Sequence, residues 1–136
     1  MRAPGSSTLT PELSVRNISA SRRFYCDILG FTMLYDRPEE GFACIEYDGC
    51  RLMLDALGIG RDFVTGPMEH PFGRGVNLEF VVADLGPLLA RLDAAGIDLF
   101  LPLETRNYRI GDDVITQRQF GVQDPDGYLI RFAQSG

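Results

Sequence analysis

The chain has 136 residues, of which 45% are hydrophobic and 24% are charged, as expected for one soluble globular domain. Its net charge of −6 at pH 7 argues against a nucleic-acid partner, because such proteins present a basic face to the phosphates. All thirteen basic residues are arginine, and the absence of lysine excludes Schiff-base and pyridoxal-phosphate chemistry.

The N-terminal stretch MRAPGSSTLTP lacks the apolar segment of a secretory signal. Its Pro, Gly and Ser content predicts a flexible arm over residues 1–8. No apolar run approaches the ~18 residues of a membrane span, so we expect no membrane partner. Three cysteines, Cys26, Cys44 and Cys50, are an odd number in a chain without a signal. This pattern favours reduced thiols and a cytoplasmic location.

A first structural unit is expected over residues 9–57. The short strand ELSV precedes the segment ISASRRFYCDIL, whose apolar residues recur with helical spacing. Asn17 can cap this helix, and Gly30 can end it in a left-handed conformation. Three strands follow, with the sequences FTMLYD, FACIEY and CRLML.

The last two of these strands are expected to form a hairpin. They are joined at YDGC, whose Asp-Gly pair accepts positive φ at both central positions of a two-residue turn. This register places Glu46 opposite Arg51, an attractive cross-strand pair. It also places Cys44 opposite Met53, so Cys44 and Cys50 are not expected to form a disulfide.

A second unit of the same design is expected over residues 75–134, after a Gly- and Pro-rich linker over residues 58–74. Residues 77–82 read as a strand, Asp84 as a helix cap, and residues 85–94 as a helix. The segments DLFLPL, DVITQRQFGVQ and YLIRFA complete the set of strands. The chain is therefore predicted to be an α+β protein of two tandem βαβββ modules.

The sequences SVRNISASRRFYCDILGF and DPDGYLIRF, on this repeated frame, resemble the glyoxalase/bleomycin-resistance/extradiol-dioxygenase superfamily (the vicinal oxygen chelate fold). The narrower stretches GVNLEFVVADL and RQFGVQDPDGYLIRF are similar to bleomycin-resistance-type members. This resemblance implies a curved, cleft-enclosing mixed sheet with helices outside. It also implies a homodimer, and a divalent metal held in the cleft of the enzymes by the first and last strands of each unit.

Carried over to this sequence, the four metal-ligand positions of the family fall on Thr10, Met53, Asn77 and Arg131. Divalent transition metals prefer imidazole and carboxylate ligands. Threonine, methionine and asparagine are poor substitutes, and a permanently protonated arginine repels a cation. We therefore expect no metal cofactor and no catalytic residue of the usual kind.

Alternation along the strands predicts which side chains face the cleft. It places Asn77 and Glu79 on the cleft side of one strand, Arg131 on that of the last strand, and Glu12 on that of the first. Our hypothesis is that Arg131 replaces the charge of the metal and pairs with Glu79 in a binding site. The alternative is that this pair only holds two strands together.

Five further residues are candidates for ligand contact: Met53, Tyr47, Tyr108, Arg118 and Phe120. Tyr108 belongs to the polar segment LETRNYRIGDDV, interpreted as a loop that either borders the cleft or is simply solvated. In TQRQFGVQ, Arg118 and Phe120 lie on one face and two glutamines on the other, and either face could line the cleft. Phe120 and Tyr47 could equally well pack in the core.

These features predict a metal-independent binding protein of the bleomycin-resistance type, a cytoplasmic homodimer that sequesters a cationic aromatic antibiotic. Its acidic balance, its altered metal positions and the family resemblance support this reading. The alternative is a lyase, isomerase or dioxygenase of the same superfamily with an atypical site. Such an enzyme would need a metal held by Glu12, Glu79 or Asp55, or would use Glu79 as a base without a metal.

Overall fold

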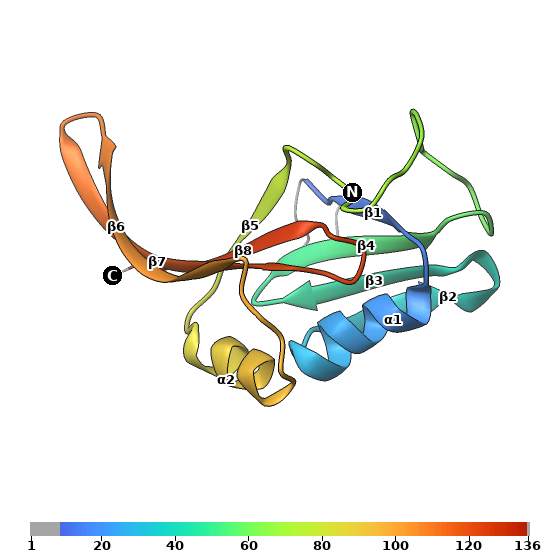
Figure 1. Ribbon diagram of the computed structural model, residues 1–136, viewed down its shortest axis with the longest axis horizontal. Coiled ribbons are helices and arrows are strands. Elements are labelled where there is room, and N and C mark those ends of the chain that lie inside the picture. The colour runs from blue at the N-terminus through green and yellow to red at the C-terminus, as the bar shows by residue number, and fades with distance from the viewer. Residues whose placement is uncertain (1–8, 136) are drawn as a thin grey trace. The chain divides into compact units, whose positions relative to one another are not determined.

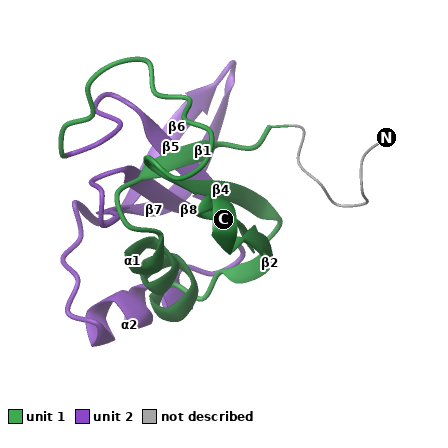
Figure 2. Ribbon diagram, turned by 90° about the vertical axis from the view of Figure 1, so that its right-hand side faces the viewer, with its two compact units in different colours: residues 1–70 green, residues 71–136 purple. Residues whose placement is uncertain are grey.

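The computed structural model describes residues 9–135, which form two compact units divided between His70 and Pro71 (Figure 2). Each unit contains one four-stranded mixed sheet, and the two strand orders are equivalent. The first sheet has the order β1-β4-β3-β2, and the second has the order β5-β8-β7-β6. This arrangement confirms the predicted α+β class with two βαβββ modules.

The first unit begins with a strand that pairs in parallel with the last strand of the unit, and the remaining strand pairs are antiparallel (Figure 1). Its apolar side chains are buried between the sheet and the helix. The elements in chain order are β1 (Glu12–Val15), α1 (Ile18–Arg22), η1 (Arg23–Ile28), β2 (Thr32–Arg37), η2 (Pro38–Glu40), β3 (Phe42–Tyr47) and β4 (Cys50–Ala56).

The predicted helix ends are confirmed in the first unit. The Asn17 side chain accepts a hydrogen bond from the Ala20 N–H at 3.1 Å, and Gly30 has a φ of 90°. Between these ends, only the first part is α-helical, and the chain continues as the π-helical segment η1. Its wider turn accompanies the burial of two consecutive aromatic residues, Phe24 and Tyr25.

The hairpin between β3 and β4 also has the predicted register. Asp48 and Gly49 both have positive φ, 48° and 82°, as a two-residue turn of this kind requires. Glu46 lies opposite Arg51. Cys44 lies opposite Met53 rather than a second cysteine.

The second unit repeats the order of strands and helix. Its core contains three phenylalanine rings, Phe80, Phe120 and Phe132, with centroids 5.6 and 5.4 Å apart from one ring to the next. All three are buried. The elements in chain order are β5 (Asn77–Val81), α2 (Gly86–Ala94), β6 (Leu101–Ile110), β7 (Asp113–Gln123) and β8 (Leu129–Ser135).

The start of α2 differs from the prediction. Asp84 was expected to cap the helix, but the N-cap position is Leu85, and the Asp84 carboxylate accepts a hydrogen bond from Gly86 N–H at 2.9 Å. The Leu85 N–H instead donates to the Gln134 side chain on β8 at 2.9 Å. A distant residue therefore satisfies one of the backbone donors at this end, which local sequence patterns do not reveal.

The interpretation of residues 103–114 as a polar loop is wrong. These residues form the far part of a long hairpin between β6 and β7, with the turn at Gly111 (Figure 1). Strand β8 pairs with β7 only over residues 117–123, so residues 107–116 extend as a two-stranded ribbon. The segment was misread because a strand exposed on both faces lacks the apolar alternation by which strands are recognised.

The turn before β8 is held by side-chain and packing contacts. The Asp124 carboxylate accepts hydrogen bonds from the N–H groups of Asp126 and Tyr128, at 2.9 and 3.0 Å. Gly127 has a φ of 92°, and a Cβ there would lie 2.4 Å from the Cβ of Pro71. Only glycine fits this position, and the turn in this way fixes where β8 begins.

The predicted N-terminal arm, residues 1–8, lies outside the described residues. Residues 57–76, which include the predicted linker, contain neither helix nor strand. Over residues 9–135, every helix is too short or too polar to cross a membrane.

Candidate functional site

The second unit carries an open depression of about 490 Å³ on the side of its sheet opposite the phenylalanine core. Alternation along the strands places polar side chains here and the phenylalanine rings on the other side. We call this surface the polar face. Its residues are Asn77 and Glu79 from β5, Tyr108 from β6, Ile115, Gln117 and Gln119 from β7, and Arg131 from β8.

Arg131 is the cation of the polar face, and its side chain is 27% exposed. Its Nε donates a hydrogen bond to Asn77 Oδ1 at 2.6 Å, and its Nη1 donates to Gln119 Oε1 at 2.9 Å. The Nη1 also lies 3.7 Å from Glu79 Oε1. The predicted ion pair with Glu79 is therefore confirmed, but the closest partners of the guanidinium are two neutral amides.

Gln119 is the centre of this network and is only 4% exposed. Its Oε1 accepts hydrogen bonds from Arg131 and from Gln117 Nε2, the latter at 3.1 Å. Its Nε2 donates to Glu104 Oε1 at 3.0 Å and to the Tyr108 hydroxyl at 2.8 Å. Both lone pairs and both hydrogens of the amide are thus used, which fixes its orientation in the sheet.

Glu79 is held from a second direction as well. Gln117 Nε2 donates to Glu79 Oε1 at 2.9 Å, on the same amide nitrogen that contacts Gln119. On the far side of the network, Glu104 lies 3.8 Å from Arg106 Nη1. The polar face is therefore a continuous chain of hydrogen bonds across all four strands.

The structure decides which face of β7 meets this network. Gln117 and Gln119 lie on the polar face, while Arg118 projects from the opposite side and is exposed. Phe120 is fully buried and stacks against Phe132 in the core. Of the candidate residues in this unit, Asn77, Glu79, Tyr108 and Arg131 are brought together, and the other two are not.

Sequence reasoning did not assign Gln117, Gln119 and Glu104 to the site. The alternating pattern QRQF showed that the two glutamines share a face, but not which face it was. A strand residue with four hydrogen-bonding sites is tolerated inside a sheet only where neighbours satisfy them. Two of those neighbours, Glu104 and Tyr108, lie in the part of β6 interpreted as a loop, and a third, Arg131, comes from β8.

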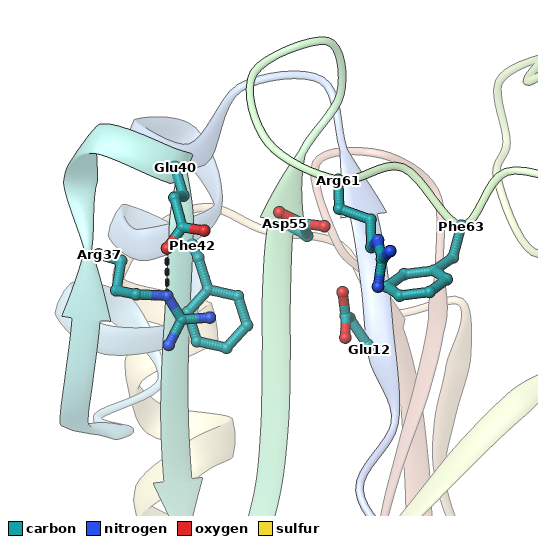
Figure 3. Close-up of a pocket in the computed structure, with 7 residues that line it drawn as sticks. All are labelled: Glu12, Arg37, Glu40, Phe42, Asp55, Arg61 and Phe63. Carbon is teal, nitrogen blue, oxygen red and sulfur yellow. Dashed lines mark hydrogen bonds and ion pairs between the residues drawn. The ribbon is translucent and has the colours of Figure 1, made fainter.

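Three predicted residues lie in the first unit. Glu12 lines a smaller pocket of about 200 Å³, which is shown in Figure 3. Met53 lies next to Glu12 in the parallel register of β1 and β4. Tyr47 alternates to the other side of β3 and packs on the Phe31 ring at 5.3 Å.

The first-unit pocket places two carboxyl groups on neighbouring strands, Glu12 on β1 and Asp55 on β4 (Figure 3). Asp55 is only 7% exposed. Burial raises the pKa of Glu12, as do hydrogen bonding to Asp55 and the like charge of Asp55, and Arg37 opposes this rise. The pocket is lined by Glu12, Arg37, Glu40, Phe42, Asp55, Arg61 and Phe63.

Two guanidinium groups of the protein border the same pocket. Arg37 pairs with Glu40 and lies over the Phe42 ring, 4.0 Å from its centroid. Arg61 lies over the Phe63 ring at 5.6 Å, and both belong to the segment after β4 (Figure 3). The pocket therefore combines carboxylates with aromatic surface that already contacts cations.

The residues at the family's metal positions do not fit a divalent metal. Asn77 and Arg131 are hydrogen-bonded to each other, so the guanidinium lies where a cation would have to bind. Met53 and Thr10 supply no carboxylate or imidazole. Across residues 9–135, no group of three or more His, Cys, Asp or Glu side chains is arranged to hold an ion.

Comparison with known proteins agrees with this fold. A bleomycin resistance protein of Geobacillus stearothermophilus is 33% identical over 131 residues, which cover 91% of this chain and 93% of that protein. The structure of TioX from Micromonospora sp. ML1 matches with a TM-score of 0.71 at 21% identity, covering 95% and 98% of the two chains. A glyoxalase/dioxygenase from Nostoc punctiforme matches with a TM-score of 0.68 at 24% identity, covering 100% and 97%.

The family model for the glyoxalase/bleomycin resistance protein/dioxygenase superfamily matches residues 8–132, almost the whole chain. The alignment with the Geobacillus protein covers nearly the same part of the chain, at 33% identity. The chain therefore belongs to the glyoxalase/bleomycin resistance protein/dioxygenase superfamily.

Proposed function

We propose that this protein is a metal-independent binding protein that sequesters a bleomycin-type antibiotic in the cytoplasm. The observation that carries the proposal is the position of Arg131. Its guanidinium occupies a metal-ligand position of the family and is fixed there by Asn77 and Gln119. The 33% identity to proteins named bleomycin resistance protein supports the choice of ligand.

A bound cationic, aromatic molecule is consistent with the charge of the chain. The net charge of −6 favours encounter with a cation over long range. The chain has no tryptophan, so ring stacking would depend on tyrosine and phenylalanine. Stacking contributes only about 0.5–1.5 kcal/mol per pair, which these residues can supply.

The residues proposed for ligand contact fall into two sets. Asn77, Glu79, Tyr108 and Arg131 share the polar face of the second unit, and Glu12 lines the pocket of the first unit. As in the family resemblance, we propose that the protein acts as a homodimer. Each unit then contributes a binding surface without performing a chemical step.

Sequestration predicts protection without chemical change to the drug. Bacteria that express the protein should grow at a higher concentration of a bleomycin-type glycopeptide than bacteria that express the Arg131→Met variant. Drug recovered from the denatured complex should have its original mass. A changed mass, or equal protection by both proteins, would contradict the proposal.

A further inference from the structure

The hydroxyl hydrogen of Tyr108 is available to a ligand on the polar face. Because the Gln119 Oε1 is taken by Arg131 and Gln117, the Gln119 Nε2 must point toward Tyr108 and donate to it. The hydroxyl oxygen therefore acts as the acceptor in this bond. Its own hydrogen is left to point elsewhere, and Tyr108 is 37% exposed beside the depression.

Arg131 offers a second donor to the same depression. Its Nε and Nη1 donate to Asn77 and Gln119. Within the described residues its Nη2 makes no hydrogen bond, and Arg131 lines the depression. Since a guanidinium carries five N–H groups, this nitrogen is available to an acceptor on a ligand.

Acceptors lie beside these donors. Glu79 uses one oxygen, Oε1, to accept from Gln117, and its side chain is 37% exposed. Gln117 uses its Nε2 for both of its contacts, which leaves its amide oxygen as an acceptor. The polar face therefore presents donors and acceptors side by side, with Ile115 as an apolar neighbour.

The charges of the surrounding network cancel. Arg131 is paired with Glu79, and Arg106 is paired with Glu104. An anionic ligand group would meet two carboxylates, and a cationic group would meet two guanidinium groups. In either case the ligand would lose hydration without a net opposite charge to replace it.

Building on the proposed function of this surface, we propose that the polar face binds a neutral group that both donates and accepts hydrogen bonds, such as a carboxamide or carbamoyl group. Its oxygen accepts from Arg131 Nη2 and the Tyr108 hydroxyl, and its N–H groups donate to Glu79 or Gln117. The cationic part of the ligand binds elsewhere.

Gln119 acts in this scheme as a positioning residue. It lies beneath the surface and fixes the direction in which the Tyr108 hydrogen points. A Gln119→Glu substitution replaces the amide donor with an acceptor. The Tyr108 hydroxyl would then donate inward to the new carboxylate, and the polar face would lose an outward donor and gain a negative charge.

The test uses three probes of the same shape that differ in charge: benzamide, benzoate and benzamidinium. Each is titrated into the whole protein, and binding is followed by NMR through the side-chain amide signals of Gln117 and Gln119. The proposal predicts that benzamide binds about tenfold more tightly than either ion. Equal affinities, or a preference for one of the ions, would overturn it.

Two variants extend the test. Gln119→Glu should shift the preference from benzamide to benzamidinium, whereas Gln134→Glu, which adds the same charge but keeps its acceptor for Leu85 N–H, should not. Because Gln119→Glu changes a buried residue and could disturb folding, Tyr108→Phe provides a second test at a partly exposed residue. It should weaken benzamide binding by about 2- to 10-fold. An unchanged benzamide affinity in Tyr108→Phe would contradict the proposal.

The outcome is separable from that of the proposed function. If a bleomycin-type glycopeptide binds but the three probes show no preference for benzamide, the assignment of a neutral group is wrong and the function stands. If benzamide is preferred but the glycopeptide does not bind, the choice of antibiotic is wrong and the chemistry of the polar face stands.

Discussion

The two units place different chemistry on the same backbone frame. In the first unit, the parallel register of β1 and β4 sets Glu12 beside Met53. In the second unit, the equivalent register of β5 and β8 sets Glu79 beside Arg131. The carboxylate is common to both units, and the difference lies in the residue beside it.

This difference decides what each carboxylate does. Glu79 has a guanidinium 3.7 Å away and takes part in a network of amides. Glu12 has a thioether beside it and meets a second carboxyl group, Asp55, so its pKa is raised by burial and by that neighbour. Two positions of the last strand therefore separate a charge-balanced surface from a carboxyl pair: Arg131 in place of Met53, and Ala133 in place of Asp55.

A second pair of equivalent positions, on the last two strands of each sheet, also carries different residue types in the two units. Asp55 lies opposite Phe42 in the first unit, and the corresponding pair in the second unit is Ala133 opposite Gln119. The first unit thus places an acidic group beside an aromatic ring, and the second places a glutamine beside a small residue. The repeated fold fixes the positions, while the residue types set the ligand chemistry.

The turns before the last strand of each unit, β4 and β8, give the largest predicted difference in stability between equivalent substitutions. Gly127 and Gly49 both have positive φ, but a Cβ on Gly127 would meet Pro71 at 2.4 Å, whereas one on Gly49 has no neighbour within 4 Å. Gly49→Ala should cost about 1–2 kcal/mol from backbone strain. Gly127→Ala should cost about 1–3 kcal/mol more from overpacking. Urea denaturation of both variants measures the difference, and equal costs would contradict this account of the turn.

The substitution Arg131→Met gives the second unit the residue found in the first. It removes two charged hydrogen bonds from a partly exposed side chain, so we expect a loss of about 2–4 kcal/mol in the free energy of unfolding. Binding of the glycopeptide should also be lost. The control is Arg118→Met, on the exposed side of β7, and a similar loss in this control would show that the network contributes nothing specific.

The Glu12→Gln substitution should change the pH dependence of stability. The pKa of Glu12 is raised in the folded state, so folding favours the protonated form of this carboxyl group. The stability that the protonated group contributes is fully present below the unfolded pKa of ~4.3. That contribution is lost as pH rises through the folded pKa. The variant should therefore be more stable than the parent at neutral pH, by less than about 1 kcal/mol because solvent screens this side chain.

At about pH 3.5, below the unfolded pKa, the Glu12 carboxyl group is protonated in both the folded and the unfolded state, so the variant and the parent should have equal stability. Denaturation curves at the two pH values make the comparison. A stabilisation that is larger in acid than at neutral pH would have the wrong sign.

The smallest expected effect comes from the reciprocal change, Met53→Arg. The new guanidinium would lie beside Glu12 in the register of β1 and β4. It should lower the pKa of Glu12, which titration followed by NMR would detect, and it should change stability by less than about 1 kcal/mol. An unaltered titration of Glu12 would show that the register alone does not make the two units interchangeable.

The parts of the fold that were predicted correctly depend on local chemistry. The Asn17 cap and the Asp48-Gly49 turn each follow from a residue and its immediate neighbours. Alternation likewise placed Arg131 and Glu79 on one face of the sheet. In each case, the preference of a few consecutive residues agrees with the final structure.

The incorrect or open predictions depend on distant partners. The N–H at the start of α2 is satisfied by Gln134, 49 residues further along the chain. The β6 arm of the ribbon, residues 107–110, is exposed on both faces and so lacks the one-sided burial that marks a strand, and the face of β7 that carries Gln119 depends on neighbouring strands. The sequence therefore indicated the cation of the site and its carboxylate, but not the amides that orient them.

The most direct test is a calorimetric titration of the whole protein with a bleomycin-type glycopeptide, with and without its bound copper, in the presence of a chelator that removes metal from the protein. We predict sub-micromolar binding of the metal-free drug at one molecule per chain, and a large loss of affinity in Arg131→Met. Two results would contradict the claim that Arg131 makes the polar face a binding site without a metal. One is an absence of heat, and the other is binding of the metal-free drug only when a divalent metal is added to the protein.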